Sequence, residues 1–193
     1  TAALAGEPIA FTGDYQIQRR SAQPLLDALN ALGAEAISAK GNGCAPITVR
    51  GPLRGGSATL PCPTSQYLSS LLLNCPLARG SAEIIVPMLN ERPYVDMTLD
   101  WLARQGITVH NDRFARFVIP GGQRYQPFTR DIPADFSSAT FFLVAAAISN
   151  ADVALHGLDM RDTQGDKAVV DMLRAMGAGI ETSAGCIRVR GGA

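Results

Sequence analysis

A short run of hydrogen-bond donors, Thr64-Ser65-Gln66, stands immediately before an apolar segment with the composition of a helix. The free backbone N–H groups and the dipole at a helix N-terminus attract anions such as phosphate. The two hydroxyls and the amide of this run would add side-chain donors to such a site. Thr and Ser are also ordinary helix caps, and from these residues alone a plain cap is the simpler interpretation.

Other polar residues precede the remaining expected helices. Asp135 stands at the equivalent place before the next apolar helix, where its carboxylate would occupy its own helix N-terminus and repel a phosphate. Arg20 follows Arg19 just ahead of a helix, and a guanidinium can hold a carboxylate or phosphate through two hydrogen bonds. A solvated pair of surface arginines is the ordinary alternative. Tyr94 could pack over a ligand ring or only fix the start of its helix.

The helices that carry these residues belong to a repeated pattern. An amphipathic run that ends in glycine and a short apolar stretch occurs at residues 20–37, 92–109 and 166–180. Its glycines recur every 71 to 73 residues, at Gly33, Gly106 and Gly177. A second pattern, an apolar helix and then a strand, occurs at residues 65–86 and 137–157. One register explains both patterns, which predicts a repeated structural unit of about seventy residues.

Local signals predict the order of elements within this unit. Pro24 and Pro93 stand near helix starts, where a missing N–H costs nothing, and the repeated glycines stand just past helix ends. Two short strands should close the unit, the second at 117–119 after a turn at 111–113. The unit is therefore β-α-β-α-β-β, an α/β (α+β) fold with helices on one side of a mixed sheet.

The ends of the chain do not coincide with the boundaries of this unit. Residues 1–61 contain only the second half of a unit, residues 62–133 a full unit, and residues 134–193 a nearly full one. We expect a chain that begins inside a repeat to be a piece of a longer protein. A naturally degenerate first repeat is the alternative.

Composition narrows the function classes. Lys+Arg and Asp+Glu balance at 17 each, so the bulk charge favours neither nucleic acid nor an anionic membrane as a partner. The four cysteines form no CxxC pair and the chain has two histidines, which argues against a zinc site or a disulfide framework. The longest apolar run, residues 141–148, is too short to span a bilayer, and no signal-peptide pattern is visible. A reducing, cytoplasmic setting is the default expectation.

Four stretches carry a family resemblance: TSQYLSSLLLNCPL at 64–77, RPYVDMTLDWL at 92–102, ADFSSATFFLVAAAI at 134–148 and QGDKAVVDMLRAMGA at 164–178. In them the sequence resembles the 5-enolpyruvylshikimate-3-phosphate synthase family, the 3-phosphoshikimate 1-carboxyvinyltransferases. The resemblance implies an enolpyruvyl transferase (inverse β-prism-like) fold with six such units in two halves. This chain would hold about two and a half of them. Residues 1–133 would belong to the half that binds shikimate 3-phosphate, and residues 134–193 would be the first unit of the other half.

The resemblance also implies an activity and a site. The family transfers the enolpyruvyl group of phosphoenolpyruvate to the 5-hydroxyl of shikimate 3-phosphate and uses no metal or organic cofactor. By resemblance, Thr64 and Ser65 would bind the substrate phosphate, and Gln66 would contact the shikimate ring region and phosphoenolpyruvate. Arg20 would grip phosphoenolpyruvate, and Tyr94 would lie beside the shikimate ring. The full-length enzyme would be a monomer, with the remainder of its chain as the partner of this segment.

Two further positions qualify this picture. Asp135 matches an acidic family residue at the crossover between the halves. Glu91 stands where a serine often precedes the Lys/Arg-Pro-Tyr element of the family. A carboxylate beside a phosphate is unfavourable, so either Glu91 points away from the site or that phosphate contact is lost.

The family's N-terminal lysine, serine and arginine would lie before Thr1, and its catalytic aspartate and glutamate beyond Ala193. We therefore expect binding residues in this chain, no catalytic acid or base, and no turnover by the chain alone.

Two other functions stay open at this point. UDP-N-acetylglucosamine enolpyruvyl transferases share the fold and use a cysteine nucleophile in a mobile loop. None of the four cysteines here stands in an obvious charged loop, which argues mildly against that function. The same units could also build a non-enzymatic binding or scaffold protein, which would bind no shikimate 3-phosphate.

Overall fold

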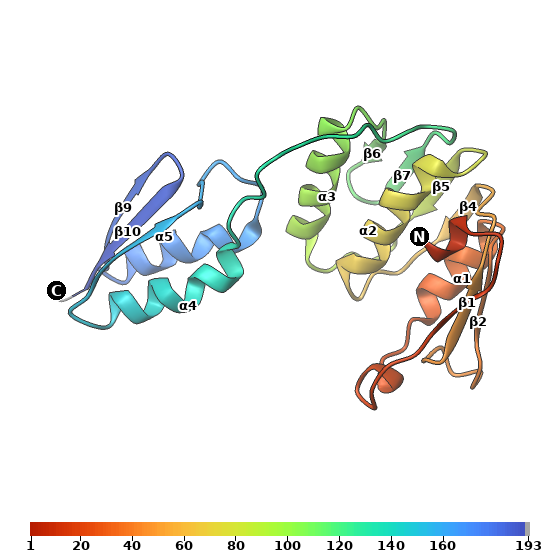
Figure 1. Cartoon of the computed structure of the whole chain (residues 1–193), viewed down its shortest axis with the longest axis horizontal. Helices are drawn as coiled ribbons and strands as arrows, with labels where there is room; N and C mark the ends of the chain where they lie inside the picture. The colour runs from red at the N-terminus through yellow and green to blue at the C-terminus, as the bar shows by residue number, and fades with distance from the viewer. Residues whose placement is uncertain (192–193) are drawn as a thin grey trace. The chain divides into compact units, whose positions relative to one another are not determined.

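A computed structural model describes residues 1–191 and shows two compact units, one of residues 1–126 and one that begins at Pro127. Residues 192 and 193, the last two of the predicted segment 134–193, lie outside the described residues. Figure 1 shows the elements in chain order by colour. The assignment of the two units to halves of a longer enzyme stays a prediction.

The N-terminal part of the first unit has the element order β-α-β-β. Its elements are β1 (Ile9–Phe11), α1 (Gln23–Ala31), β2 (Glu35–Ser38) and β3 (Ile47–Arg50), with short 3-10 helices at Ala2–Leu4 and Ile17–Arg19. The strands form an antiparallel sheet in the order β1-β3-β2, in which Val49 pairs with Ile9 on one side and Ala36 on the other. This arrangement corresponds to the half unit that the repeat predicts.

A complete unit follows in the same compact body. Its elements are β4 (Gly56–Thr59), α2 (Ser65–Asn74), a 3-10 helix (Cys75–Leu77), β5 (Ala82–Ile85), α3 (Arg92–Arg104), β6 (His110–Asp112) and β7 (Arg116–Ile119). The sheet order is β4-β5-β7-β6, with β4 and β5 parallel and the other pairs antiparallel. The two helices α2 and α3 lie side by side (Figure 1). The predicted β-α-β-α-β-β order, its mixed sheet and the fold class are confirmed. The predicted start of this unit at residue 62 is wrong, because its first strand, β4, begins at Gly56.

The second compact unit has the order α-β-α-β-β. Its elements are α4 (Phe136–Ala147), β8 (Asp152–His156), a 3-10 helix (Gly165–Lys167), α5 (Ala168–Ala175), β9 (Gly179–Ser183) and β10 (Cys186–Arg190). The three strands form an antiparallel sheet in the order β8-β10-β9. A separate apolar core, which includes Phe136, Leu143 and Ile187, holds these helices on this sheet.

The predicted helix boundaries follow from local chemistry. Pro24 and Pro93 are the second residues of α1 and α3, within the first turn, where an N–H has no intrahelical acceptor. Gly33 and Gly106 follow these helices with φ of 87° and 70°, a region that suits a residue without Cβ. Thr64 caps α2 and Asp135 caps α4 through side-chain oxygens.

The predicted turn at 111–113 is wrong by two residues. Asn111 lies within β6, and the chain reverses at residues 113–115, where Arg113 and Phe114 have φ of 48° and 62°. The Phe114 N–H donates to the Asn111 side-chain oxygen at 2.8 Å. Asn111 therefore supports the turn from the preceding strand instead of forming it.

The core of the first unit leaves one face of α2 and one face of α3 uncovered by the sheet. The buried core of this region includes Leu68, Leu71, Leu72, Ile84, Val95, Leu102, Phe117 and Ile119. The three leucines share one face of α2, which packs toward the sheet. Polar side chains such as Ser69 and Thr98 are left on the opposite faces, where a pocket forms. Among the described residues, no helix is both long and apolar enough to cross a membrane.

Candidate functional site

The beginnings of α2 and α3 border a pocket of about 640 Å³ in the first unit. Its lining residues come from the two helices and from the residues that cap them: Thr64, Ser65, Gln66, Ser69, Leu73, Glu91, Tyr94, Met97, Thr98 and Trp101. The structure therefore brings the predicted residues Thr64, Ser65, Gln66 and Tyr94 together around one space, and Glu91 with them.

The beginning of α2 presents its donors to this pocket. Thr64 has an extended backbone, with φ of −135° and ψ of 140°, and its hydroxyl accepts the Gln66 N–H at 3.5 Å. That distance is long for a capping bond, so the backbone N–H groups in the first turn of α2 are only weakly hydrogen-bonded by the cap. Ser65 is 2% exposed, yet its hydroxyl and backbone N–H both point to the pocket rim. Thr64 is thus the cap of α2, and the neighbouring Ser65 groups donate to Glu91 at the same helix start.

Glu91 points into this group of donors. Its Oε2 accepts hydrogen bonds from the Thr64 hydroxyl at 3.3 Å, the Ser65 hydroxyl at 3.1 Å and the Ser65 backbone N–H at 3.2 Å. The Ser65 N–H, with the Ser65 and Thr64 hydroxyls, holds the pKa of Glu91 below its usual value. The alternative in which Glu91 points away from the site is wrong, because the donors at the start of α2 attract its carboxylate.

The rest of the pocket lining combines two aromatic side chains with two hydroxyls. The Ser69 and Thr98 hydroxyls lie 2.7 Å apart across the α2–α3 contact, and Thr98 also donates to the Tyr94 carbonyl at 2.9 Å. Tyr94 is 45% exposed at the rim. Sequence reasoning missed Ser69, Thr98 and Trp101, although their helical spacing from Ser65 and Tyr94 places them on the same faces.

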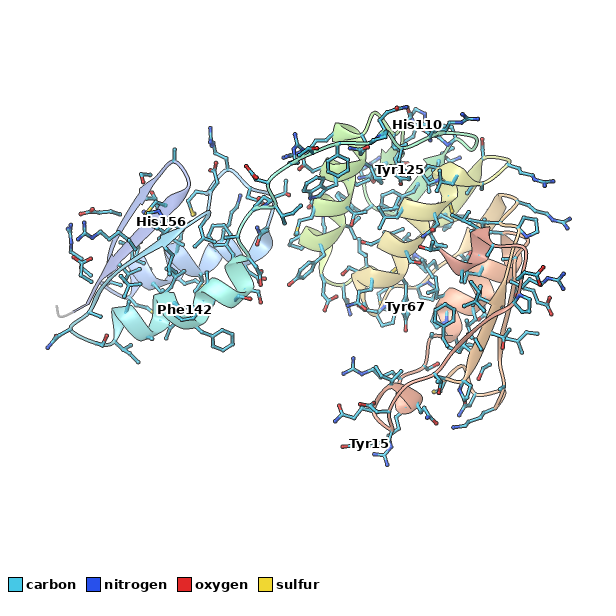
Figure 2. The ribbon with its side chains drawn as sticks, in the orientation of Figure 1. Tyr15, Tyr67, His110, Tyr125, Phe142 and His156 are labelled. Atoms are coloured by element: carbon cyan, nitrogen blue, oxygen red, sulfur yellow. The ribbon has the colours of Figure 1, made fainter. Side chains whose placement is uncertain are left out.

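Arg20 is not among the residues that line this pocket. It is exposed and follows the 3-10 helix Ile17–Arg19, where its N–H donates to the Ile17 carbonyl at 3.1 Å. The adjacent Ser21 carbonyl accepts the Tyr67 hydroxyl at 2.6 Å. Tyr67, labelled in Figure 2, is the α2 residue after Gln66. This bond ties the segment that carries Arg20 to the first turn of α2.

Asp135 belongs to the second unit and caps α4. One carboxylate oxygen accepts the Ser137 N–H and the other accepts the Ser138 N–H, each at 3.0 Å. The Ser138 hydroxyl, followed by these N–H groups, holds the pKa of Asp135 below its usual value. The predicted occupation of this helix N-terminus by its own carboxylate is what the structure shows.

Replacing Asp135 by alanine should lower the free energy of unfolding of the second unit by about 1 kcal/mol, the usual cost of a lost cap. Because the folded state lowers the pKa of Asp135, its stabilisation is present above the unfolded value of about 3.9 and is lost as the pH falls through the lower folded value. Urea unfolding followed by the amide NMR signals of α4, at about pH 7 and about pH 3, measures both effects.

Asparagine is a cap without a charge, so Asp135→Asn should lose less stability than Asp135→Ala and show no such pH dependence. Equal stability of wild type and Asp135→Ala at neutral pH would contradict this role.

Charge in the α2–α3 pocket is confined to one side chain. Of the described residues that line it, Glu91 alone is ionisable near neutral pH. Within residues 1–191, no group of three or more His, Cys, Asp or Glu side chains is placed to hold a metal ion. The chemistry that this pocket offers is hydrogen-bond donation at a helix N-terminus beside an aromatic wall.

Comparison with known proteins extends this picture to the whole chain. A family model described as EPSP synthase (3-phosphoshikimate 1-carboxyvinyltransferase) matches residues 1–192. The chain belongs to the EPSP synthase family. The match includes both compact units, and the family resemblance seen in the sequence is confirmed.

Individual EPSP synthases agree with this assignment. The chain is 50% identical over 191 residues to a 3-phosphoshikimate 1-carboxyvinyltransferase of Ruminiclostridium cellulolyticum, and 52% identical over 191 residues to one of Acetivibrio thermocellus. Each alignment covers 99% of this chain and 45% of the relative. The solved EPSP synthase from Acinetobacter baumannii matches with a TM-score of 0.76 at 26% identity, over 98% of this chain and 44% of that one. The chain thus spans about 45% of the length of the curated EPSP synthases it matches.

Proposed function

We propose that this chain supplies the surface that holds shikimate 3-phosphate in a 3-phosphoshikimate 1-carboxyvinyltransferase. That enzyme transfers the enolpyruvyl group of phosphoenolpyruvate to the 5-hydroxyl of shikimate 3-phosphate and releases phosphate. Membership of the EPSP synthase family supports the reaction. The observation that carries the binding role is the convergence of the Thr64 hydroxyl, the Ser65 hydroxyl and the Ser65 N–H at the beginning of α2.

These three donors match the needs of a phosphate ester. A phosphate carries about 1.5 to 2 negative charges and three acceptor oxygens, and hydrogen bonds to charged groups are about twice as strong as neutral ones. The donors lie at a helix N-terminus, where the dipole favours an anion. In this proposal Gln66 and Tyr94 contact the ring that carries the phosphate, since both line the same pocket.

Arg20 has a different proposed role, the grip on phosphoenolpyruvate. Its guanidinium is exposed and belongs to a segment that is bonded to α2 through Tyr67 and Ser21. A guanidinium can hold a carboxylate or a phosphate through two parallel hydrogen bonds. The side chain of Asp135 is committed to its own helix, so we assign it the cap and no substrate contact.

Calorimetric titration with shikimate 3-phosphate, and with shikimate as the matched ligand without phosphate, tests the proposal. Shikimate 3-phosphate should bind at least about 100-fold more tightly, because two or more charge-assisted hydrogen bonds contribute about 1.5–3 kcal/mol each. A chain that folds and binds neither ligand, or binds both equally, would contradict the assignment. A UDP-N-acetylglucosamine enolpyruvyl transferase or a scaffold protein of the same fold would give one of those two results.

The same titrated samples test the expectation that the chain alone has no turnover. The pocket contains one carboxylate among its lining residues and no His, Lys or Asp, so it lacks a pair of groups for general acid and base catalysis. Addition of phosphoenolpyruvate and shikimate 3-phosphate should release no phosphate above the uncatalysed rate. Measured phosphate release by the 193 residues would show that the catalytic groups lie within them.

Two of the four cysteines, Cys62 and Cys75, are unsuited to the role of a nucleophile in a cysteine-dependent relative. Burial raises the pKa of Cys62 to about 11 and the pKa of Cys75 to about 12, so both thiols stay protonated and poorly nucleophilic. All four cysteines are free. Free thiols also suit the reducing cytoplasm, which we propose as the location of the protein. We also propose that the full-length enzyme is a monomer.

A further inference from the structure

The side chain of Glu91 accepts hydrogen bonds from a group of donors at the beginning of α2. We call the Thr64 hydroxyl, the Ser65 hydroxyl and the Ser65 N–H the α2 anion seat. A single oxygen of Glu91, Oε2, accepts from all three at 3.1 to 3.3 Å. Three donors that converge on one oxygen, at a helix N-terminus, form a site that is suited to an anion and already holds one.

Glu91 reaches the seat from an unusual backbone position. It is the N-cap residue of α3 and has φ of 57° and ψ of 43°, a left-handed conformation that is costly for a residue with Cβ. N-cap side chains commonly bond to the N–H groups of their own helix, whereas Glu91 makes no such bond and crosses to α2. The neighbouring Arg92 places its guanidinium over Phe114, 3.7 Å from the ring centroid. The three groups that donate to Glu91 at the seat, two hydroxyls and a backbone N–H, are all neutral.

We propose that Glu91 is a specificity-determining residue, an internal anion that occupies the α2 anion seat and must leave it before a phosphate ester binds. The proposal rests on the proposed function, because it takes the seat to be the place of the substrate phosphate. It goes beyond that function because it makes a residue of the protein, Glu91, the competitor of the substrate phosphate for the α2 anion seat.

The competition follows from shared donors and like charge. A phosphate at the seat needs the same Thr64 and Ser65 donors that Oε2 accepts, so the two groups cannot be bound there together. A carboxylate left beside the bound phosphate would repel it. Glu91 is exposed, so its side chain can rotate away without uncovering the core. A ligand without an anionic group gains too little at the seat to displace Glu91, which is how the residue discriminates among ligands.

Calorimetry on four forms of the full chain tests the proposal: wild type, Glu91→Ser, Glu91→Gln and Glu83→Gln. The probes are shikimate 3-phosphate and, separately, inorganic phosphate. Serine removes the charge and introduces a small hydroxyl that can donate, whereas glutamine removes the charge and keeps the length and an acceptor oxygen. Glu83 is a carboxylate of β5 that pairs with Arg116 outside the pocket, so Glu83→Gln controls for the loss of one negative charge elsewhere.

Glu91→Ser should bind both probes at least about tenfold more tightly than wild type, because the repelling charge and the competitor are removed together. Glu91→Gln should gain less, since its amide oxygen still accepts from the seat, and Glu83→Gln should match wild type. Unchanged or weaker binding by Glu91→Ser and Glu91→Gln, with the fold verified by circular dichroism, would overturn the proposal.

The two probes separate this inference from the proposed function. Tighter binding of inorganic phosphate by Glu91→Ser, without any preference for shikimate 3-phosphate, would support the role of Glu91 and refute the proposed substrate. Tight binding of shikimate 3-phosphate by wild type, with no gain in either Glu91 variant, would support the substrate and overturn the role of Glu91. A failure of all folded forms to bind either probe would overturn both.

Discussion

Replacing Phe117 by alanine should lower the free energy of unfolding of the first unit by about 3–5 kcal/mol, a large part of the stability of a domain of this size. Phe117 lies in β7, between β5 and β6, and none of its surface is exposed. Its ring meets that of Phe114 edge to face, with centroids 6.1 Å apart. Alanine would leave a cavity beneath the two helices that border the pocket, which the sheet cannot fill by collapsing.

Urea unfolding followed by the fluorescence of Trp101 measures this loss in the first unit, since Trp101 lies in α3 and is the single tryptophan of the sequence. Phe117→Leu should lose much less, because it keeps most of the buried volume. Phe142→Ala is the matched control. Phe142 projects from α4 of the second unit into solvent (Figure 2) and is 61% exposed. A Phe117→Ala chain as stable as Phe142→Ala would contradict the role of Phe117 in the core.

The fold was largely predictable because its signals are local. A cap, a proline in the first turn and a glycine after the last turn each act over a few residues, and Thr64, Pro93 and Gly106 all stand where those rules place them. Repetition of these signals every 71 to 73 residues then predicted the order of strands and helices without knowledge of long-range contacts.

The candidate site was predictable only in part because its geometry depends on contacts across helices. The donors of Thr64 and Ser65 follow from a helix start, but the inward direction of Glu91 follows from a left-handed backbone that glutamate rarely adopts. Ser69 and Thr98 form the pocket wall only because α2 and α3 pack with those faces together. The turn at 113–115 was missed for a similar reason, since Asn111 acts there through its side chain.

The differences between expectation and structure at Glu91 and at the turn share a physical cause. In both places a side chain satisfies backbone or hydroxyl donors that sequence periodicity does not describe: Asn111 accepts the Phe114 N–H, and Glu91 accepts the Ser65 N–H. Periodicity locates buried faces, whereas these contacts depend on the positive φ of a few non-glycine residues. The same kind of contact places the one charge of the pocket at its proposed phosphate position.

Removal of both hydroxyls at the beginning of α2, in the variant Thr64→Val with Ser65→Ala, should lower the affinity for shikimate 3-phosphate by about 100-fold. Two charge-assisted hydrogen bonds are lost, while the Ser65 backbone N–H remains in place. Affinity for shikimate, measured in the same calorimetric series, should stay within about threefold of wild type, because that ligand brings no phosphate to these donors.

Ser70→Ala provides the matched control for this double variant, because Ser70 lies in α2 but is not among the residues that line the pocket. It should bind shikimate 3-phosphate as wild type does. The lost Thr64 cap should cost less than the usual ~1 kcal/mol of stability, because its bond to the Gln66 N–H is long at 3.5 Å. Binding is therefore compared only at temperatures where each form is fully folded. An equal loss of affinity for shikimate and shikimate 3-phosphate would mean that the variant had deformed the pocket. A selective loss for the phosphate ester would place its phosphate at Thr64 and Ser65, where Glu91 now accepts their hydrogen bonds.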